Sequence, residues 1–488
     1  MRFEMKFFYL AFKYTMFIVL IVSVSMVATV VGDNNKSSIP DSPFGFHPAA
    51  IVEPGYPANG YIDAKEIGIK WYRPGTNLFW FKVQPDLDST EYDFTFYDRK
   101  FGLIPEDSGV LANIAPETQD SDQGRLLEGS WMPINMAQYE DFVKASVERY
   151  DGDGIDDMPG LVNPVLYWQV SNEPNALLRS DFSVLQKITY QAIKQACLEC
   201  KVVIGGVSGF NPEGYVQGFN ERYVPILEEL DGQYIDVFDF HWYGNATGEY
   251  RMFDSEARED VLGYVRDSLV DYGFPPDLPI WITEMGSYSG DTSDNMFHFQ
   301  TERQQAMDYF KRFIYPLSRG IEKVFIAFGL IEGFKDTDSY FDHTGLIYDG
   351  QGSNDLGLGI KKLSYYTYKK MTESLEGADW STLITLRDGT DTDHLYLFQV
   401  EKDGKPIHIA WWDYFDEPQY ASSDMKRIVL NGLTGDELIV TSVIPYPESG
   451  IEVTDYANSF ASSAHRIVNG SAMIFLHKDP VIIVEQSS

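Results

Sequence analysis

The sequence predicts an α/β fold, a (β/α)8 TIM barrel followed by an antiparallel β-sandwich, and three observations support this prediction. Two short apolar segments, residues 165–170 and 278–283, each run almost directly into a glutamate, Glu173 and Glu284. Other apolar runs alternate with segments of helical periodicity through residues 41–375. After that range the pattern changes to short alternating strands separated by turns. A carboxylate at the carboxyl end of a buried strand is where a (β/α)8 barrel keeps its chemistry.

The length and composition fit this organisation. A chain of 488 residues with 44% hydrophobic content can hold one large domain and a smaller one. The formal charge is −35, from 38 basic and 73 acidic residues. This balance argues against nucleic acid and anionic membrane surfaces as partners, because both would repel the chain. It also disfavours a strongly anionic polysaccharide unless the cleft is locally basic.

Residues 1–32 have the pattern of a secretory signal peptide or an N-terminal anchor. Basic residues precede an apolar run at residues 16–31, and a polar stretch follows. We expect cleavage near residue 31 or 32 and a secreted or extracytoplasmic protein, with membrane association only if the segment is retained. Residues 33–40 read as a linker. No other segment is apolar enough to span a bilayer.

The predicted barrel consists of strands at residues 44–47, 68–73, 110–115, 165–170, 201–206, 235–243, 278–286 and 323–328. Helical patterns occur at residues 136–150, 180–200, 300–318 and 363–375. In the predicted sandwich, residues 376–488, strands are expected at residues 394–400, 406–412, 438–443 and 472–476. The sandwich would either brace the barrel or bind carbohydrate, and we favour bracing.

Glu173 and Glu284 follow the fourth and seventh predicted strands, so they can face each other across the mouth of the barrel. Retaining glycosidases need one carboxyl group as acid/base and another as nucleophile, about 5–5.5 Å apart. The alternative reading of Glu173 is a loop residue that caps the next helix. The second glutamate favours the catalytic reading.

At these residues the chain resembles glycoside hydrolase clan A, the retaining (β/α)8 glycosidases whose fourth strand ends in Asn-Glu(-Pro) and whose seventh ends in Glu. The resemblance covers roughly residues 41–374 and is closest to families five and thirty-nine. It implies that Glu173 is the acid/base and Glu284 the nucleophile. It also implies that Asn172 contacts the 2-hydroxyl of the sugar.

Other strand ends carry candidate supporting residues. Arg73 ends the second strand, where its guanidinium can keep a carboxylate ionised. Clan A members typically have an Arg there, bound to the nucleophile, although a surface loop Arg is the alternative. His47 ends the first strand. His241 and Tyr243 end the sixth, where clan A barrels often carry a His and a Tyr, and they are expected to tune or bind the carboxyl groups.

Two aromatic residues complete the candidate site. Trp242 is expected to stack on a sugar, unless residues 241–243 are only a structural cluster. Phe328 ends the eighth strand, where many clan members place a Trp beneath the cleaved sugar. Either Phe328 or a Trp from another loop would take that place, so the sequence leaves the sugar open.

Two further motifs have structural rather than functional readings. Cys197 and Cys200 lack a second pair and a suitably placed His, so they cannot complete a zinc site. We expect two partly buried thiols or one local disulfide. Residues 151–157 are rich in Asp and Gly but lack the twelve-residue calcium-loop pattern. A solvated acidic turn is the expectation there.

Together these observations predict a retaining glycoside hydrolase that degrades a neutral, β-linked poly- or oligosaccharide by double displacement. The mechanism requires no metal and no cofactor. Alternatives are a transglycosidase, in which a sugar hydroxyl intercepts the same intermediate, and a non-catalytic carbohydrate-binding surface protein. Linkage, endo or exo action and oligomeric state are not predicted.

Overall fold

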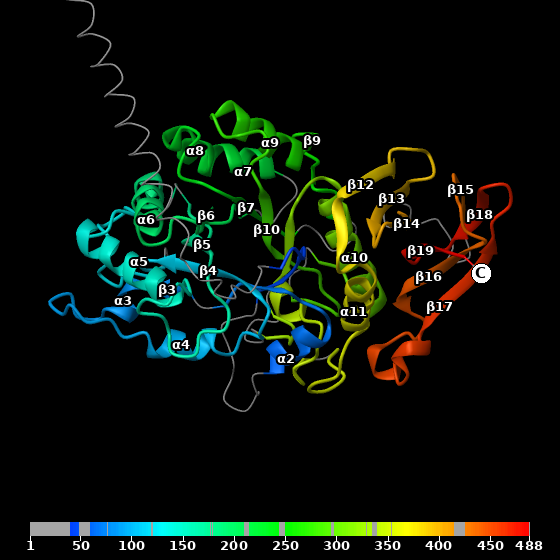
Figure 1. The fold of residues 1–488 in the computed structure, drawn as a ribbon, viewed down its shortest axis with the longest axis horizontal. Helices are drawn as coiled ribbons and strands as arrows, with labels where there is room; N and C mark the ends of the chain where they lie inside the picture. Colours follow the sequence, from blue (N-terminus) through cyan, green and yellow to red (C-terminus); the bar gives the residue numbers. More distant parts are fainter. Residues whose placement is uncertain are drawn as a thin grey trace, which may run out of the picture. The chain divides into compact units, whose positions relative to one another are not determined.

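The computed structural model describes residues 40–487, except residues 48–58, 76, 119–120, 176, 178, 209–213, 244–248, 294–296, 328, 334–338, 353 and 414–424 (Figure 1). The predicted signal segment, residues 1–32, lies outside the described residues. Among the residues described, no helix combines the length and the apolar character needed to cross a bilayer.

Within the described residues, eight parallel strands form the barrel in the order β6-β5-β4-β2-β1-β11-β10-β7. A parallel bridge between Val203 and Val237 joins β6 to β7 and closes the sheet on itself. The strands are β1 (Phe44–Phe46), β2 (Trp71–Tyr72), β4 (Gly109–Ala115), β5 (Tyr167–Val170), β6 (Lys201–Ile204), β7 (Phe238–Trp242), β10 (Ile280–Met285) and β11 (Lys323–Ile326). Each lies within or overlaps a predicted strand, so the predicted barrel is confirmed.

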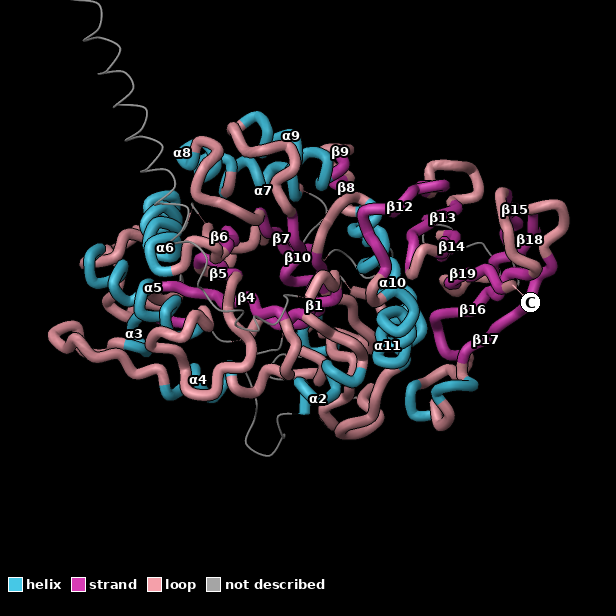
Figure 2. Tube along the Cα trace, viewed as in Figure 1, coloured by secondary structure: helices cyan, strands magenta, loops and turns pink. Residues whose placement is uncertain are grey.

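Helices connect and surround these strands (Figure 2). They are α2 (Asn59–Glu66), α3 (Trp80–Val83), α4 (Thr95–Phe101), α5 (Met136–Tyr150), α6 (Phe182–Ala196), α7 (Tyr215–Arg222), α8 (Val224–Leu230), α9 (Val261–Asp271), α10 (Glu302–Ser318) and α11 (Leu363–Leu375). Short elements in the connections are β3 (Leu78–Phe79), β8 (Phe253–Asp254), β9 (Glu259–Asp260), η1 (Glu249–Arg251) and η2 (Tyr340–His343). The amphipathic helix predicted at residues 136–150 matches α5 and buries Tyr139, Phe142, Val143 and Val147.

The interior of the barrel near the amino ends of its strands is filled by an apolar layer. Its members are Trp71, Leu111, Tyr167, Val203, Val237, Trp281 and Phe325. The rings of Tyr167 and Trp281 stack with centroids 4.9 Å apart, and Trp71 packs edge-on against both. These large side chains close the lower half of the barrel, because inward-facing residues of small barrels meet at the axis.

The C-terminal part forms a β-sandwich-like domain of two antiparallel sheets. Its strands are β12 (Ala378–Asp388), β13 (Leu395–Lys402), β14 (Lys405–Trp412), β15 (Lys426–Asn431), β16 (Glu437–Pro445), β17 (Phe460–Arg466), β18 (Ser471–Leu476) and β19 (Val481–Gln486), with η3 (Gly450–Glu452) and η4 (Tyr456–Asn458) between them. The larger sheet has the order β12-β13-β14-β19-β16-β17, and β15 pairs with β18. A core that includes Leu395, Trp412, Ile428 and Ile474 lies between the two sheets.

The other face of the larger sheet packs on the barrel. Trp411 belongs to the main core, and its ring centroid lies 6.3 Å from that of Phe310 in α10. Arg303 at the start of α10 makes a 2.9 Å ion pair with Asp479. Aromatic residues of this sheet, such as Trp411, are thus buried against the barrel.

The strands β12, β15, β17 and β19 were not among the predicted ones. In β12 and β17 most side chains are exposed or half-buried, so the alternation of apolar and polar residues is weak. The predicted domain boundary falls between α11, which ends at Leu375, and β12, which begins at Ala378.

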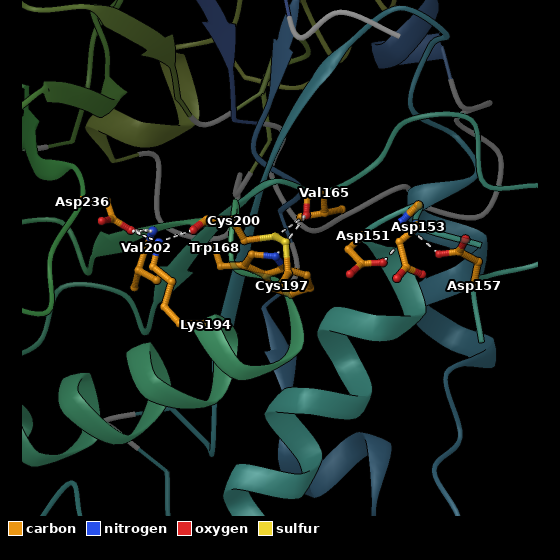
Figure 3. Close-up of a disulfide and its surroundings, with 11 residues drawn as sticks. Asp151, Asp153, Asp157, Val165, Trp168, Lys194, Cys197, Cys200, Val202 and Asp236 are labelled. Atoms are coloured by element: carbon orange, nitrogen blue, oxygen red, sulfur yellow. Dashed lines mark hydrogen bonds and ion pairs between the residues drawn. A yellow bond between two sulfur atoms is a disulfide. The ribbon is translucent and has the colours of Figure 1, made fainter. Parts of the chain in front are cut away.

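The two cysteines form a disulfide at the turn between α6 and β6 (Figure 3). Both cysteines are buried, and Lys194 bonds to the carbonyl oxygen of Cys200. The local disulfide is one of the two outcomes expected from the sequence. Figure 3 also shows the acidic turn, where the carboxylates of Asp153 and Asp157 accept hydrogen bonds from backbone amides of the same turn.

Candidate active site

A polar layer lies directly above the apolar one, towards the carboxyl ends of the strands. Successive residues of a strand point to opposite faces, so residues two apart share a face. Arg73, Gln169 and Thr283 are two residues beyond Trp71, Tyr167 and Trp281, respectively. Asp239 and Asn113 take the same place above Val237 and Leu111, and all five polar residues are buried. The interior therefore changes from apolar to polar within one two-residue step.

Glu173 and Glu284 meet above this layer. An oxygen of each carboxyl group and a ring nitrogen of His241 all lie within 4.8 Å of one another. The Glu284 side chain is 3% exposed, whereas that of Glu173 is 21% exposed. The structure therefore brings together the two carboxyl groups that the sequence predicted.

The backbone of Glu173 is unusual for a non-glycine residue. Its φ is 45°, in the left-handed region, and Ser171 two residues earlier has a φ of 61°. Such conformations are costly for residues with a side chain and are enriched at functional sites. Pro174 follows, and because proline has no backbone N–H it cannot continue the hydrogen bonding of β5. The chain thereby turns Glu173 out of the strand and into the mouth of the barrel.

Glu284 is held as an anion by several donors. Arg73 Nη1 lies 2.6 Å from one oxygen, and the Tyr243 hydroxyl donates to the other at 2.7 Å. Burial alone would raise the pKa of Glu284, but the positive charges of His241 and Arg73 outweigh it and lower the pKa to about 2. Glu284 is therefore ionised at neutral pH and fixed in orientation.

Arg73 connects three groups through one planar guanidinium. Besides Glu284, it donates from Nε to Gln169 Oε1 at 2.6 Å and from Nη2 to Asn172 Oδ1 at 2.5 Å. This use of the whole fork is available to Arg but not to Lys. Arg73 thus joins the ends of β2, β5 and β10.

His241 lies between the two glutamates. Its Nδ1 is 2.6 Å from Glu173 Oε1 and 3.5 Å from Glu284 Oε2. Burial alone would lower the pKa of His241, but the carboxylates of Glu284, Asp239 and Glu173 raise it to about 10. A positive charge at His241 is therefore favoured at neutral pH.

His47 also lies near Glu284, but its pKa is shifted in the opposite direction to that of His241. Its Nδ1 donates to the carbonyl oxygen of Arg73 at 2.9 Å, and its Nε2 lies 3.6 Å from Glu284. Burial and the charge of Arg73 lower the pKa of His47 to about 4. At neutral pH His47 is uncharged.

The two predicted aromatic residues have different outcomes. Trp242 is 2% exposed and packs against Tyr215 with ring centroids 5.4 Å apart, on the outer face of the barrel. It does not join the glutamates, because it alternates with His241 and Tyr243 along the strand, and this placement argues against sugar stacking. Phe328 lies outside the described residues. A different aromatic residue, Phe341, lies with its centroid 5.1 Å from that of Tyr243.

Apart from Arg73, sequence reasoning missed the buried polar layer beneath the glutamates. Gln169 and Thr283 both donate to Asp239, and Asn113 donates to the carbonyl oxygen of Ser171 at 2.6 Å. The available signal was the alternation of inward-facing and outward-facing side chains along a strand. Asp239 lies two residues before His241 on the same strand and must share its inward face.

Glu173, His241 and Glu284 also have a spacing that could hold a metal ion. The donor set does not suit one. A ligating histidine needs an unprotonated nitrogen, whereas the surrounding carboxylates favour a protonated His241. Arg73 already supplies a positive charge to Glu284. The residues present therefore fit a carboxylate pair with protein counter-ions better than a metal centre.

No protein-family model matches the chain, and no curated protein matches its sequence. Solved structures do match. A family 39 glycoside hydrolase from the gut symbiont Bacteroides cellulosilyticus WH2 is 16% identical, with a TM-score of 0.62 over 94% of this chain and 83% of its own. A thermostable GH51 alpha-L-arabinofuranosidase from Thermotoga petrophila RKU-1 is 13% identical, with a TM-score of 0.56 over 92% of this chain and 97% of its own.

A glycoside hydrolase family 30 subfamily 8 xylanase from Clostridium acetobutylicum is also 13% identical, with a TM-score of 0.50 over 91% of this chain and 96% of its own. At these identities the likeness concerns the fold. The predicted resemblance to clan A glycoside hydrolases is confirmed at that level, as a (β/α)8 barrel with a C-terminal β-domain.

Proposed function

We propose that the protein is a retaining glycoside hydrolase that cleaves O-glycosidic bonds of a β-linked poly- or oligosaccharide by double displacement. The observation that carries the proposal is the meeting of Glu173 and Glu284 at the mouth of the barrel, where an oxygen of one carboxyl group lies within 4.8 Å of an oxygen of the other. This spacing suits the retaining mechanism, because the inverting one needs about 6.5–9.5 Å between the carboxyl groups to admit a water. The fold shared with glycoside hydrolases supports the same reading.

In the first step Glu284 attacks the anomeric carbon. Its charge and orientation are set by Arg73 and Tyr243, which bind its two oxygens. A new bond forms between the anomeric carbon and a Glu284 oxygen as the glycosidic bond breaks. The leaving oxygen receives a proton from Glu173, which is the more exposed of the two carboxyl groups.

In the second step a water molecule releases the sugar. Glu173, now without its proton, takes one from the water, whose oxygen bonds to the anomeric carbon while the bond to Glu284 breaks. The charge of Glu284 returns, and Arg73 is in place to stabilise it. Two inversions at the same carbon give net retention.

We infer that Asn172 binds the sugar beside Glu284. Its side-chain oxygen is used by Arg73, so its amide N–H groups are what it offers to a ligand. This fits a donor to the sugar 2-hydroxyl, as the resemblance implied. Hydrogen bonds to this hydroxyl strengthen in the transition state of retaining enzymes.

We also propose that the protein acts outside the cytoplasm. The disulfide between Cys197 and Cys200 suits an oxidising compartment. The predicted signal at residues 1–32 provides the route. Cleaved protein would be secreted, whereas a retained segment would leave it anchored.

The proposal is tested with a panel of aryl β-glycosides (glucoside, mannoside, xyloside, galactoside and fucoside), followed by polysaccharides. We expect one sugar to be cleaved, the first product to keep the β configuration by NMR, and Glu173→Gln and Glu284→Gln to lose that turnover while remaining folded. Chelator should leave the rate unchanged. An inverted first product, or full activity in either variant, would contradict the mechanism. An added acceptor sugar distinguishes transglycosylation, and binding without turnover would favour a carbohydrate-binding protein.

A further inference from the structure

Asp239 lies beneath His241 and accepts hydrogen bonds from Gln169 on β5 and from Thr283 on β10. Gln169 Nε2 donates to Oδ2 at 2.5 Å, and the Thr283 hydroxyl donates to the same oxygen at 2.6 Å. The Thr283 backbone N–H donates to Oδ1 at 3.0 Å. Asp239 is fully buried. All three contacts bring donors to Asp239, which is the arrangement that suits a carboxylate.

The orientation of Gln169 supports this assignment of donors. Its Oε1 faces Arg73 Nε at 2.6 Å, and arginine can only donate. The Gln169 amide nitrogen must therefore point the other way, towards Asp239 and the carbonyl oxygen of Ile204. The donor to Asp239 is thus fixed by chemistry rather than by an arbitrary choice of amide rotamer.

The Thr283 hydroxyl donates its proton to Asp239, so towards His241 only its oxygen lone pairs remain. Its Oγ1 lies 3.2 Å from His241 Nε2 and can only accept there. Nε2 must therefore carry a proton, and the carboxylate of Asp239 at 3.6 Å reinforces this. The proton on the other ring nitrogen, Nδ1, is then the variable one.

We propose that Asp239, acting through the hydroxyl of Thr283, is a positioning residue that fixes a proton on Nε2 of His241, so that Nδ1 and Glu173 share the proton that the leaving group receives. The 2.6 Å contact between Nδ1 and Glu173 Oε1 is the place of that proton. This inference rests on the proposed glycosidase function and assigns the proton supply of the same site.

The proton count over the two steps balances. Before cleavage the pair of His241 and Glu173 holds one proton between Nδ1 and Oε1, in addition to the proton on Nε2. That shared proton moves to the leaving oxygen as the glycosidic bond breaks, which leaves a neutral imidazole and a carboxylate. In the second step the pair regains one proton from the attacking water. Asp239 takes no part in the proton transfer.

The groups around His241 agree with a shared proton. Glu173 and Glu284 face Nδ1, and Asp239 faces Nε2. Positive charge comes from Arg73, which is bound to Glu284, and His47 is neutral because its pKa is lowered to about 4. On the side of α7 and the loop that follows it, the phenols of Tyr215 and Tyr223 have pKa values raised by burial and remain uncharged.

Gly206, after β6, has no side chain, and His241 and Asp239 occupy the space that one would fill. A Cβ atom built at Gly206 would lie 2.1 Å from His241 Nε2 and 2.7 Å from Asp239 Oδ2. Any larger residue would therefore push the imidazole away from Thr283 and Asp239. The packing of β6 against β7 thus depends on the same pair of residues as the proton placement.

The test compares Asp239→Asn with the wild type across leaving groups. We expect kcat/KM to fall about 10- to 100-fold for a natural oligosaccharide or an alkyl glycoside, which need a proton on the leaving oxygen. It should change less than about threefold for the dinitrophenyl glycoside of the same sugar, which leaves without one. The basic limb of the pH profile should move to lower pH. Thr283→Val should behave like Asp239→Asn, and Thr283→Ser like the wild type.

A matched control is Asp236→Asn. Asp236 lies three residues before Asp239, just before β7 begins, and pairs with Lys194 at 2.8 Å. It should alter neither the leaving-group dependence nor the pH profile. Equal losses with both leaving groups in Asp239→Asn would reduce Asp239 to a structural role and overturn the inference.

A second readout does not depend on activity. In protein with 15N-labelled histidine, the ring signals of His241, identified by their loss in His241→Gln, should show a protonated Nε2 in the wild type. Asp239→Asn should remove that preference. A wild-type tautomer with a bare Nε2 would overturn the inference even if the enzyme cleaves glycosides. A protonated Nε2 in a protein that cleaves nothing would contradict the proposed function and leave the proton placement standing.

Discussion

The two halves of the barrel interior are built from the same strands but have opposite chemistry. Near the amino ends, rings such as Trp71 and Trp281 pack together and close the barrel. Two residues further along the same strands, Arg73 and Thr283 belong to a polar layer that supports the glutamates. One layer is held by burial of apolar area, and the other by hydrogen bonds and charge pairs.

This difference indicates that stability and chemistry are separated along the barrel axis. The apolar layer contributes to folding, and the polar layer fixes the orientation and the charge of Glu173 and Glu284. Lys323 is an exception, since its ammonium lies 4.5 Å from the Trp71 ring at the apolar end. Substitutions in each layer should therefore affect different measurements.

The largest effect is expected from Arg73→Lys in the polar layer. Lys keeps the charge but cannot donate to Glu284, Gln169 and Asn172 at once. We expect kcat/KM to fall about 10³-fold, or about 4 kcal/mol of transition-state stabilisation, with Tm lowered by only a few degrees. Steady-state kinetics and thermal unfolding on one preparation measure both. A loss in kcat/KM below about tenfold would show that the three hydrogen bonds of Arg73 contribute little to catalysis.

Trp281→Ala should show the reverse pattern in the apolar layer. The Trp281 ring contacts Trp71, Tyr167 and Phe325, and its removal leaves a cavity at the barrel axis. We expect a loss of about 3–4 kcal/mol in the free energy of unfolding, measured by denaturant titration. The kcat of the remaining folded enzyme should be nearly unchanged, and Trp281→Phe should recover most of the stability. A selective loss of kcat with normal stability would contradict the separation.

The disulfide should contribute to stability rather than to chemistry, because it closes the turn that leads into β6. Replacing both cysteines in Cys197→Ser/Cys200→Ser should cost about 2 kcal/mol, the loop-closure entropy of so short a loop. Chemical denaturation under oxidising conditions measures this, and the wild type in the presence of reductant is the comparison. KM should not change. A change in KM without a change in stability would place the disulfide in the functional half.

The smallest effect is expected from Lys323→Met. Burial lowers the pKa of Lys323 from 10.5 to about 8, so between these pH values the unfolded chain binds more protons than the folded one. The charged lysine therefore costs stability below pH 8, and this cost disappears as the pH rises to 10.5. We expect the variant to be about 1–2 kcal/mol more stable at pH 7, since lost contacts with the Trp rings offset part of the gain. The difference should shrink at pH 10, and a constant difference would contradict it.

Much of the fold could be predicted because apolar runs end abruptly at Pro or Gly. The strands leading to Arg73, Glu173 and Glu284 were placed in this way. The exposed strands of the C-terminal domain were not, since β12 and β17 have little apolar alternation. Local patterns reveal buried strands better than half-exposed ones.

Within the site, the residues at strand ends were predicted and those inside the strands were not. Asp239 and Gln169 look like isolated polar residues within apolar runs, and their inward position follows only once the strands are paired into a barrel. The alternation of faces along a strand also explains the difference at Trp242. The sequence pattern places it beside His241, but neighbouring residues on a strand point to opposite faces. Sequence spacing located the carboxyl groups, whereas their support depends on tertiary structure.

The most direct test of the account is covalent trapping of the nucleophile. The protein is incubated with an activated 2-deoxy-2-fluoro glycoside of the sugar found in the panel, and its intact mass and peptide masses are measured. We expect one added fluorosugar on the peptide that contains Glu284, and none in Glu284→Gln. Absence of an adduct on a substrate that is turned over, or an adduct at another residue, would contradict the assignment of Glu284 and with it the two-step mechanism.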